Sequence, residues 1–213
     1  MAALMLEVAR FREWSKAYPP EARYGEWECD YSHWHDLHNA VLELFRSRPF
    51  ESWSADELEA VLYAIARDNE IQYLARELRE HHAELLIPLA AAATEMGEEA
   101  LKWQLAEELG QLGQAGGEAE RLLLLLARDE GEYVRRRALA ALARIGAPAT
   151  EELALAAWHR PDENQQWARM MALWCLHRIG SPHLAQLLDD AERDERPYLS
   201  AYARGLRKGE VEP

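Results

Sequence analysis

Apolar residues recur at helical spacing between Arg128 and Gly146, in the sequence RDEGEYVRRRALAALARIG. The positions i, i+4, i+7, i+8 and i+11 are filled by Val134, Ala138, Ala141, Leu142 and Ile145. This spacing places them on one face of a helix, which we expect to be buried. Two of the five are alanines, so a neighbouring helix can approach closely. Gly146 then ends the helix, because glycine readily adopts the left-handed conformation that follows a helix end.

The same combination of apolar faces and helix-breaking residues predicts twelve helices along the chain. Two lie in the first fifty residues and are separated by a loop or short turn at Glu21–Tyr31. Ser32 is placed to cap the second helix, and Ser54 with Glu57 forms a capping-box sequence at the start of the third. The predicted helices span residues 2–16, 33–46, 54–67, 70–81, 84–96, 99–112, 118–128, 132–145, 150–158, 164–179, 182–193 and 197–208.

Glycines end several of these helices at a regular interval. Gly113, Gly146 and Gly180 lie 33 and 34 residues apart, and they end the related sequences LGQLG, ARIG and HRIG. A period of this length is typical of stacked helical hairpins. We therefore predict an all-α fold, an α-solenoid (superhelix) of about five helical hairpins over residues 54–209, with capping helices over residues 1–50. The whole chain, residues 1–213, is interpreted as a single domain.

The segment DEGEYVRRRALAALARIG resembles the HEAT repeat, particularly its short bacterial form. The resemblance covers roughly residues 54–208 and is strongest over residues 118–180. It implies a ladder in which a turn aspartate and an arginine of the following helix join neighbouring repeats. Asp129 and Arg135 match those two positions, and the corresponding residues of the adjacent repeats are Lys102, Asp162 and Arg169. Members of this family most often bind proteins and some are enzymes, so the fold alone does not decide the function.

The net charge of the chain limits the classes of partner that we expect it to bind. The 213 residues include 24 Lys and Arg against 38 Asp and Glu, a formal net charge of −14. An acidic chain repels phosphate backbones, so nucleic acid is not the expected ligand. The acidity favours solubility, and it also suits a basic protein partner.

Several features favour a cytoplasmic protein without membrane contact. Cys29 and Cys175 lie far apart, which is not the pattern of a disulfide framework. The first residues, MAALMLEVARF, have no basic segment before the apolar positions and do not resemble a signal peptide. Apolar runs such as Leu122–Ala127 are much shorter than the roughly 20 residues of a membrane helix.

The sequence CDYSHWHDLH, residues 29–38, contains the strongest candidates for a metal site, His33, His35 and His38. His35 and His38 are three residues apart, so on a helix they share a face and could both reach one ion. The spacing is not a recognised zinc pattern, because no second pair of ligands follows and Cys29 has no neighbouring cysteine. Surface or packing histidines are the preferred interpretation, and we predict no metal and no cofactor.

The sequence contains no recognised catalytic motif. It has no GxSxG, and no serine, cysteine or lysine in a known activating context. The glycine-rich segment Gly110–Gly117 lacks the Lys-Ser/Thr of a phosphate-binding loop and is interpreted as a connector between helices. HEAT-like hydroxylases carry His-Glu pairs that this sequence lacks, and HEAT-like alkylpurine glycosylases need a basic groove beside their aromatic residues. No catalytic residue is therefore assigned.

Aligning the second helices of the repeats on their terminal glycines brings large and charged residues to equivalent positions off the apolar face. Exposed Trp, Met and Arg side chains commonly anchor protein interfaces, so we expect these residues to form a ridge along the concave surface of the stack. The ridge residues are Trp103, Glu107, Arg136, Arg137, Met170, Trp174 and His177. The competing interpretation is that irregular stacking buries Trp103, Met170 and Trp174, as most of the eight tryptophans are expected to pack between helices.

These observations predict a non-catalytic module that binds a protein partner on its concave face. One form that suits the small size, acidity and expected location is a bacterial immunity protein, which neutralises a toxin domain by covering it. A basic toxin would suit the charge. The alternative is an enzyme, either a HEAT-like DNA glycosylase or a metal-dependent enzyme that uses the histidine cluster.

Overall fold

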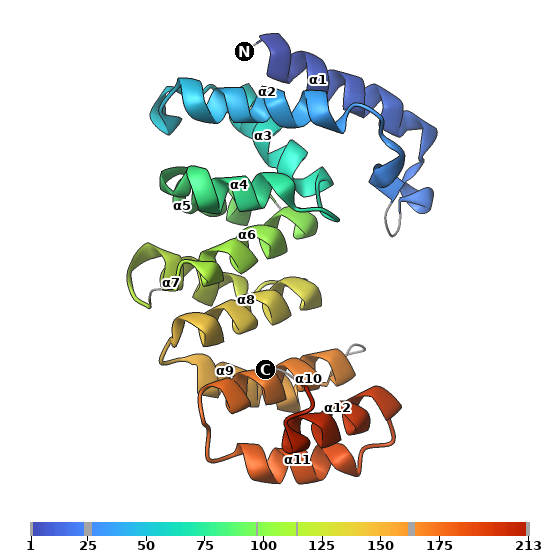
Figure 1. Cartoon of the computed structure of the whole chain (residues 1–213), viewed down its shortest axis with the longest axis vertical. Helices are drawn as coiled ribbons and strands as arrows, with labels where there is room; N and C mark the ends of the chain where they lie inside the picture. The colour runs from blue at the N-terminus through green and yellow to red at the C-terminus, as the bar shows by residue number, and fades with distance from the viewer. Residues whose placement is uncertain (1, 24–26, 97, 114, 162–164, 212–213) are drawn as a thin grey trace. The chain divides into compact units, whose positions relative to one another are not determined.

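The computed structural model describes residues 2–23, 27–96, 98–113, 115–161 and 165–211 (Figure 1). In these residues the chain forms twelve α-helices and four short 3-10 helices, and no strand. All twelve helices predicted from the sequence are found, so the all-α class is confirmed. The chain divides into two compact units, Met1–Glu108 and Leu109–Pro213, and the division falls within helix α6 (Glu99–Gln111). The single-domain organisation stays a prediction.

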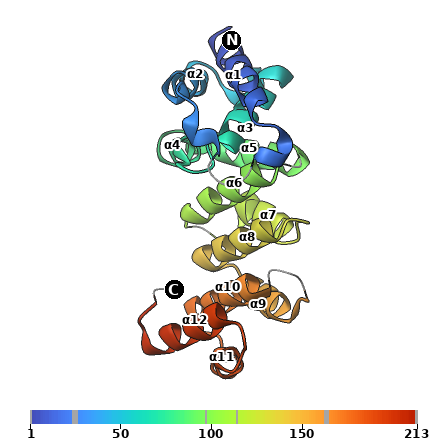
Figure 2. The same ribbon diagram turned by 90° about the vertical axis from the view of Figure 1, so that its right-hand side faces the viewer.

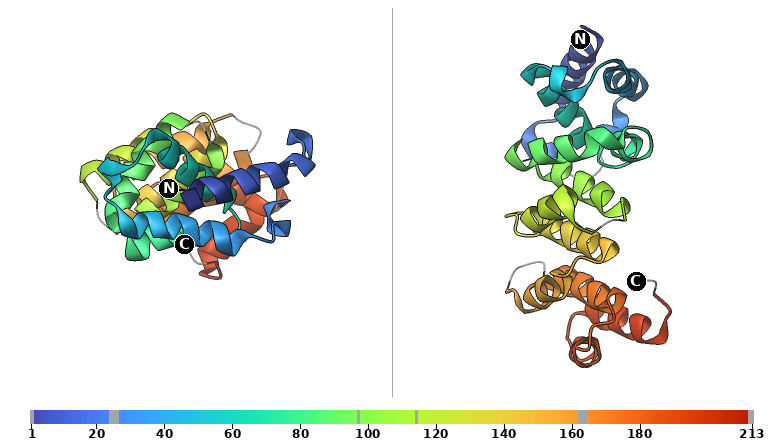
Figure 3. Two further views of the ribbon diagram at one scale, coloured as in Figure 1. Left: turned by 90° about the horizontal axis from the view of Figure 1, so that it is seen from above. Right: turned by 90° about the vertical axis from the view of Figure 1, so that its left-hand side faces the viewer.

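The first unit contains five complete α-helices, the first part of α6 and four 3-10 helices. The α-helices are α1 (Ala2–Trp14), α2 (Trp34–Ser47), α3 (Ala55–Arg67), α4 (Tyr73–His81) and α5 (Ala83–Met96). The 3-10 helices are η1 (Ser15–Ala17), η2 (Pro20–Ala22), η3 (Trp27–Asp30) and η4 (Phe50–Ser52). Helix α1 packs against α2 and α3, α2 also contacts α4, and α4 packs against α5. Figure 3 shows α1 and α2 side by side at the N-terminal end of this unit.

An aromatic cluster, which we call the Phe11 cluster, joins α1 to η3 and α2. Phe11 is fully buried, and its ring centroid lies 4.6 Å from that of Tyr31 and 5.3 Å from that of Trp34. Trp14 and Trp27 stack on each other with their ring centroids 5.8 Å apart. Tilted and edge-to-face ring pairs add to the free energy that burial of apolar area provides. The segment predicted as a loop at residues 21–31 is therefore packed at Trp27 and Tyr31.

One of the two predicted helix caps is present. Ser54 begins α3 with a capping box, in which the Ser54 hydroxyl accepts a hydrogen bond from the Glu57 N–H at 3.2 Å. The Glu57 carboxylate in turn accepts one from the Ser54 N–H at 2.9 Å, and this bond is the main cause that lowers the pKa of Glu57. The prediction that Ser32 caps α2 is wrong. The N-cap residue is His33, whose side chain makes no capping hydrogen bond.

Helix α4 begins three residues later than the sequence pattern predicts. Gln72 has a φ of 54°, in the left-handed region, so the chain turns where the apolar spacing indicated helix. The buried carboxylate of Asp68 accepts a hydrogen bond from the Leu74 N–H at 2.8 Å. A side-chain acceptor at this place satisfies a backbone donor that the first turn of a helix leaves unpaired.

The second unit contains three helical hairpins. Their helices are α7 (Gly117–Leu126), α8 (Glu132–Ile145), α9 (Thr150–His159), α10 (Gln165–Arg178), α11 (Leu184–Glu192) and α12 (Pro197–Lys208). In each hairpin the two helices pack against each other, and α10 also packs against α8 and α12 (Figure 2). These three hairpins account for three of the about five predicted from the period, whereas in the first unit α4 packs against α5.

The apolar face predicted for α8 is confirmed, because all five of its residues are buried: Val134, Ala138, Ala141, Leu142 and Ile145. Gly146 has a φ of 70°, and the Ala147 N–H donates to the Leu142 carbonyl at 3.0 Å. Gly180 ends α10 in the same way, with a φ of 68°. The left-handed glycines turn the chain so that the N–H groups at and after them donate to carbonyls at the helix ends, which would otherwise lack partners.

Helices α6 and α8 approach each other closely at Gly110 and Ala141. A Cβ atom added to Gly110 would lie 2.6 Å from the Ala141 Cβ and 2.7 Å from the Ala141 Cα. The small residues predicted to allow close helix packing on α8 do so at this point. Gly110 is buried and belongs to α6, so the glycine-rich segment predicted as a connector begins inside a helix.

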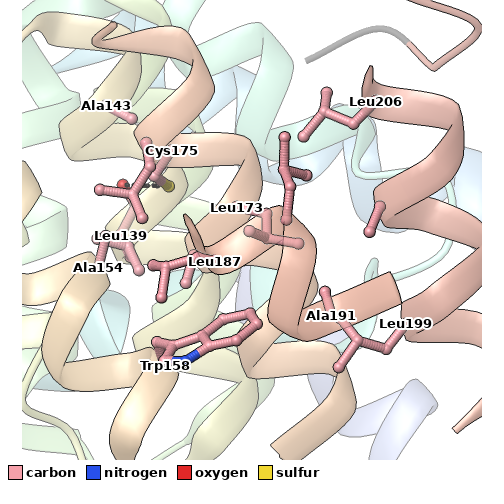
Figure 4. Close-up of a cluster of buried hydrophobic side chains, with 14 residues drawn as sticks. Leu139, Ala143, Ala154, Trp158, Leu173, Cys175, Leu187, Ala191, Leu199 and Leu206 are labelled. Atoms are coloured by element: carbon pink, nitrogen blue, oxygen red, sulfur yellow. Dashed lines mark hydrogen bonds between the residues drawn. The ribbon is translucent and has the colours of Figure 1, made fainter. Parts of the chain in front are cut away.

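The core of the second unit surrounds Trp158 and Leu173 (Figure 4). It includes fully buried Cys175, whose S–H donates to the Leu139 carbonyl at 3.7 Å. Burial raises the pKa of the Cys175 thiol. A thiol that stays protonated is a poor nucleophile, so Cys175 has a packing role.

Charge is divided unequally between the two units. Residues 1–108 contain 10 Lys and Arg and 22 Asp and Glu, which gives a formal charge of −12. Residues 109–213 contain 14 and 16 of these residues, which gives −2. The acidity that the whole sequence shows therefore belongs almost entirely to the first unit.

Across the described residues, none of the helices combines the length and the apolar composition needed to span a membrane.

Candidate protein-binding site

The predicted ridge residues are distributed over both units. Trp103 and Glu107 lie on α6 in the first unit, and the other five lie on α8 and α10 in the second. Trp103 is only 9% exposed, so it does not have the exposure that an anchor requires, and the prediction of an exposed Trp103 is wrong. Burial of a large apolar ring is favourable, which explains its position. The binding role of the ridge stays a prediction.

On α8, the ridge residues Arg136 and Arg137 are only partly accessible. Ala140 and Ala143, which align with Trp174 and His177 of α10, are buried, because α8 packs against α7, α9 and α10 and so is covered on more than its apolar stripe. Arg136 and Arg137 are half-buried, and their guanidinium groups lie 4.8 Å and 4.9 Å from the ring centroid of Tyr133. Cation–π contacts of this kind hold long arginine side chains in place.

On α10, the ridge residues become more exposed toward the C-terminal end. Met170 and Trp174 are half-buried and pack against the core of the second unit, whereas His177 is exposed. The guanidinium groups of Arg144 and Arg178 each lie 5.6 Å from the Trp174 ring. Trp174 therefore has both a packing role and an accessible edge among cationic groups.

A pocket of about 370 Å³ lies in the second unit between α8 and the α9–α10 hairpin, and we call it the α8–α9 pocket. Its apolar lining comes from Leu139, Leu153, Ala157 and Met171. Its volume is within the range of ligand-binding pockets. Arg136 is the one ridge residue that also lines it.

Arginines dominate the charged groups around this pocket. Its described charged lining residues are Arg128, Glu132, Arg135, Arg136 and Arg160, four cations against one carboxylate. Arg136 donates to the Glu132 carboxylate at 3.0 Å, and Arg135 donates to the carbonyls of Asp129 and Glu130 at 2.9 Å and 2.6 Å. Arg128 and Arg160 are exposed. An apolar pocket with guanidinium groups at its edge can hold an apolar group that is attached to an anion.

The sequence pattern did not predict an exposed aromatic pair formed by Trp167 and Tyr198. Trp167, in the first turn of α10, is 36% exposed, and Tyr198, in the first turn of α12, is 62% exposed. Their rings are stacked with centroids 5.7 Å apart. Trp167 precedes Ala168, which lines the α8–α9 pocket. The signal that could have indicated the pair is the aromatic residue that recurs in the first turns of α8, α10 and α12, where Tyr133 is the one in α8.

The candidate metal ligands have separate partners. His33 contacts the Asp36 carboxylate at 3.1 Å, and His35 is exposed and hydrogen-bonded to Asn39 at 3.0 Å. His38 lies 3.5 Å from the buried Asp68 carboxylate, so His35 and His38 do not face one common point. No group of three His, Cys, Asp or Glu side chains suited to a metal ion forms within the part of the chain that the structure describes.

Comparison with known families identifies the helices of the second unit. Residues 119–207 match the family model for HEAT repeats, from α7 to the end of α12. These residues are HEAT repeats. The resemblance noted in the sequence is confirmed over these residues, and with it the α-solenoid class. No curated protein matches the chain.

Arg169 and Asp194 form a rung of the ladder that the resemblance implies. Arg169 on α10 donates to the Asp194 carboxylate, in the turn before α12, at 3.1 Å. Asp194 also accepts hydrogen bonds from Arg196, at 3.0 Å from its N–H and 2.7 Å from Nε. Asp162, the turn aspartate of the preceding repeat, lies outside the described residues. Asp194 was not assigned to the ladder from the sequence, so it is an addition to that set.

The hydrogen bonds from Arg196, together with the charge of Arg169, lower the pKa of Asp194 to about 2. The ordinary pKa of an aspartate is about 3.9. Because the folded-state pKa is the lower one, the ionised carboxylate stabilises the fold above about pH 4. This contribution is lost as the pH falls toward 2.

We predict that Asp194→Ala lowers the free energy of unfolding at pH 7 by about 1–3 kcal/mol, the usual cost of losing hydrogen bonds to a charged group. The measurement is urea unfolding of both proteins at a series of pH values. The difference should shrink as the pH falls from about 4 toward 2. Asp190→Ala is the matched control, because Asp190 pairs with Arg193 in solvent at 3.5 Å and should contribute less than about 0.5 kcal/mol. A difference that is independent of pH would contradict the role given to Asp194.

Proposed function

We propose that the protein is a non-catalytic interaction module that binds a protein partner through its HEAT repeats. The observation that carries the proposal is the stacked Trp167–Tyr198 pair, exposed by 36% and 62% in a unit whose other large aromatic rings are better covered. Trp and Tyr are enriched among the residues that dominate binding energy at protein interfaces. HEAT repeats are commonly protein-interaction modules, which supports the same conclusion.

The proposal is tested by affinity capture from a lysate of the native cell. The wild-type protein is compared with the double variant Trp167→Ala/Tyr198→Ala, and each captured protein is then purified and titrated by calorimetry. We expect the double variant to bind the partner at least tenfold more weakly, a loss of about 1.4 kcal/mol or more. Leu125→Ala is the matched control, because Leu125 is an apolar side chain of the same unit that is 49% exposed. Failure of the wild-type chain to retain any partner, or equal binding by the double variant, would argue against the proposal.

The finer form of the proposal is an immunity protein that covers a toxin domain. The formal charge of −12 in the first unit supports a toxin with a basic surface, because opposite charges increase the association rate and disfavour wrong partners. The test is coexpression with the product of each adjacent reading frame. Immunity requires that one product stops growth when expressed alone and that this chain restores growth. If neither product is neutralised, the immunity form is wrong even where capture identifies another partner.

A further inference from the structure

The α8–α9 pocket combines an aliphatic lining with a lining of arginine side chains. Its inner lining is aliphatic, with Leu139 from α8, Leu153 from α9 and Met171 from α10. Its volume of about 370 Å³ is enough for one or two side chains of a partner but small for a large cofactor. The interior therefore favours a compact apolar group.

The charged lining of the pocket is arranged in two pairs. Arg135 donates hydrogen bonds to the carbonyls of Asp129 and Glu130, and Arg136 donates to the Glu132 carboxylate. Arg128 follows the end of α7 and Arg160 follows the end of α9, the first helices of two consecutive hairpins, and both are exposed. Their positive charges also interact favourably with the negative C-terminal ends of the two helix dipoles, which accounts in part for arginines at these positions. Two exposed guanidinium groups at one pocket can approach the same ligand.

Guanidinium groups bind carboxylates through paired hydrogen bonds, and the aliphatic interior excludes water from the neighbouring contacts. A ligand that satisfies both properties has an apolar side chain flanked by carboxylates. These features favour an extended peptide over an isolated anion.

We propose that the α8–α9 pocket binds an acidic peptide segment of the partner, with one apolar side chain in the pocket and adjacent Asp or Glu side chains on Arg128 and Arg160. This inference rests on the proposed function, because it assumes a protein partner. It implies that the two units prefer partner surfaces of opposite charge. The first unit, with a charge of −12, suits basic surfaces, and this pocket in the second unit suits an acidic segment.

The test uses the full chain labelled with ¹³C at the methionine methyl groups. Met171 lines the pocket, whereas its neighbour Met170 does not, so the two methyl signals are a site reporter and an internal control. They are assigned with Met171→Leu and Met170→Leu. The probe is a capped pentapeptide with a central leucine and two glutamates on each side. Two further peptides replace the glutamates by lysines or the leucine by alanine.

We expect the glutamate–leucine peptide to shift the Met171 signal in a saturable way and to leave Met170 nearly unchanged. The lysine peptide should give no saturable shift, and the alanine peptide should bind at least threefold more weakly. Arg128→Gln/Arg160→Gln should weaken binding of the first peptide at least fivefold. Arg121→Gln is the matched control and should change it less than twofold, because Arg121 pairs with Glu118 on α7 and does not line the pocket.

Four results would overturn the inference: no shift of Met171, equal shifts by the lysine peptide, unchanged binding by the double arginine variant, or tighter binding of a short single-stranded DNA. The affinity capture described above separates this inference from the proposed function. If Arg128→Gln/Arg160→Gln retains the captured partner with unchanged affinity, the pocket inference fails while protein binding stands. If capture finds no partner, the proposed function fails whatever the peptides show.

Discussion

Phe11→Ala is expected to lower the free energy of unfolding of the first unit by about 3–5 kcal/mol, the range for removing a fully buried aromatic ring. Phe11 contacts several aromatic rings at once, with Tyr31 and Trp34 among the nearest. Its removal leaves a cavity and breaks the packing of α1 on its neighbours. Urea unfolding followed by tryptophan fluorescence measures the change, because Trp14 and Trp34 lie against Phe11, each with its ring centroid 5.3 Å away.

The matched control for Phe11 lies on the same helix. Leu6 is 59% exposed, so Leu6→Ala should change the free energy of unfolding by less than about 0.5 kcal/mol. A loss below about 1 kcal/mol for Phe11→Ala would mean that α1 does not depend on the Phe11 cluster for its attachment.

Gly110→Ala is expected to destabilise the second unit by about 1–3 kcal/mol, although alanine is the better helix former. In an exposed helix this change would stabilise by about 1 kcal/mol, because glycine loses more backbone entropy on folding. At Gly110 the added methyl group would meet the Cβ and Cα of Ala141, at 2.6 Å and 2.7 Å, and backbone cannot move aside as a side chain can. Thermal unfolding followed by circular dichroism gives the sign directly.

Gly205→Ala is the control for this prediction. It lies within α12, and the nearest atom that its methyl group would meet is the Val211 Cγ2 at 2.5 Å, close to the end of the chain. The atoms met there belong to the Val211 side chain and not to backbone, so they can shift and this substitution should be neutral or slightly stabilising. Equal stabilisation by both substitutions would show that α6 and α8 are not in close contact at Ala141.

The repeat architecture could be predicted from the sequence because its signals are local. A helix stop such as Gly146 requires only its own backbone conformation, and the Ser54–Glu57 capping box lies within four residues. The late start of α4 was not predictable in this way. It depends on Gln72, a residue other than glycine in the left-handed region, and on the Asp68 carboxylate, which accepts from the N–H of Leu74 six residues later.

Exposure of single residues on the second helices could not be predicted, because it depends on how much of each helix its neighbours cover. Trp103 and Trp167 illustrate the two outcomes. Both lie in second helices of hairpins, but Trp103 is 9% exposed and Trp167 is 36% exposed. Asp194 was missed for a related reason. The last repeat departs from the regular spacing, so its aspartate became evident only through its contact with Arg169.

The unequal division of charge means that folding brings like charges together mainly in the N-terminal half of the chain. Twelve excess negative charges within 108 residues repel one another when the first unit becomes compact, whereas the second unit is close to neutral. Dissolved ions weaken this self-repulsion, since charges more than about 10 Å apart are largely screened at 0.1 M salt. Salt thus stabilises one half of this chain selectively. A cationic surface bound to the first unit would act in the same direction, so occupancy by a basic partner and stability of the N-terminal half are thermodynamically linked.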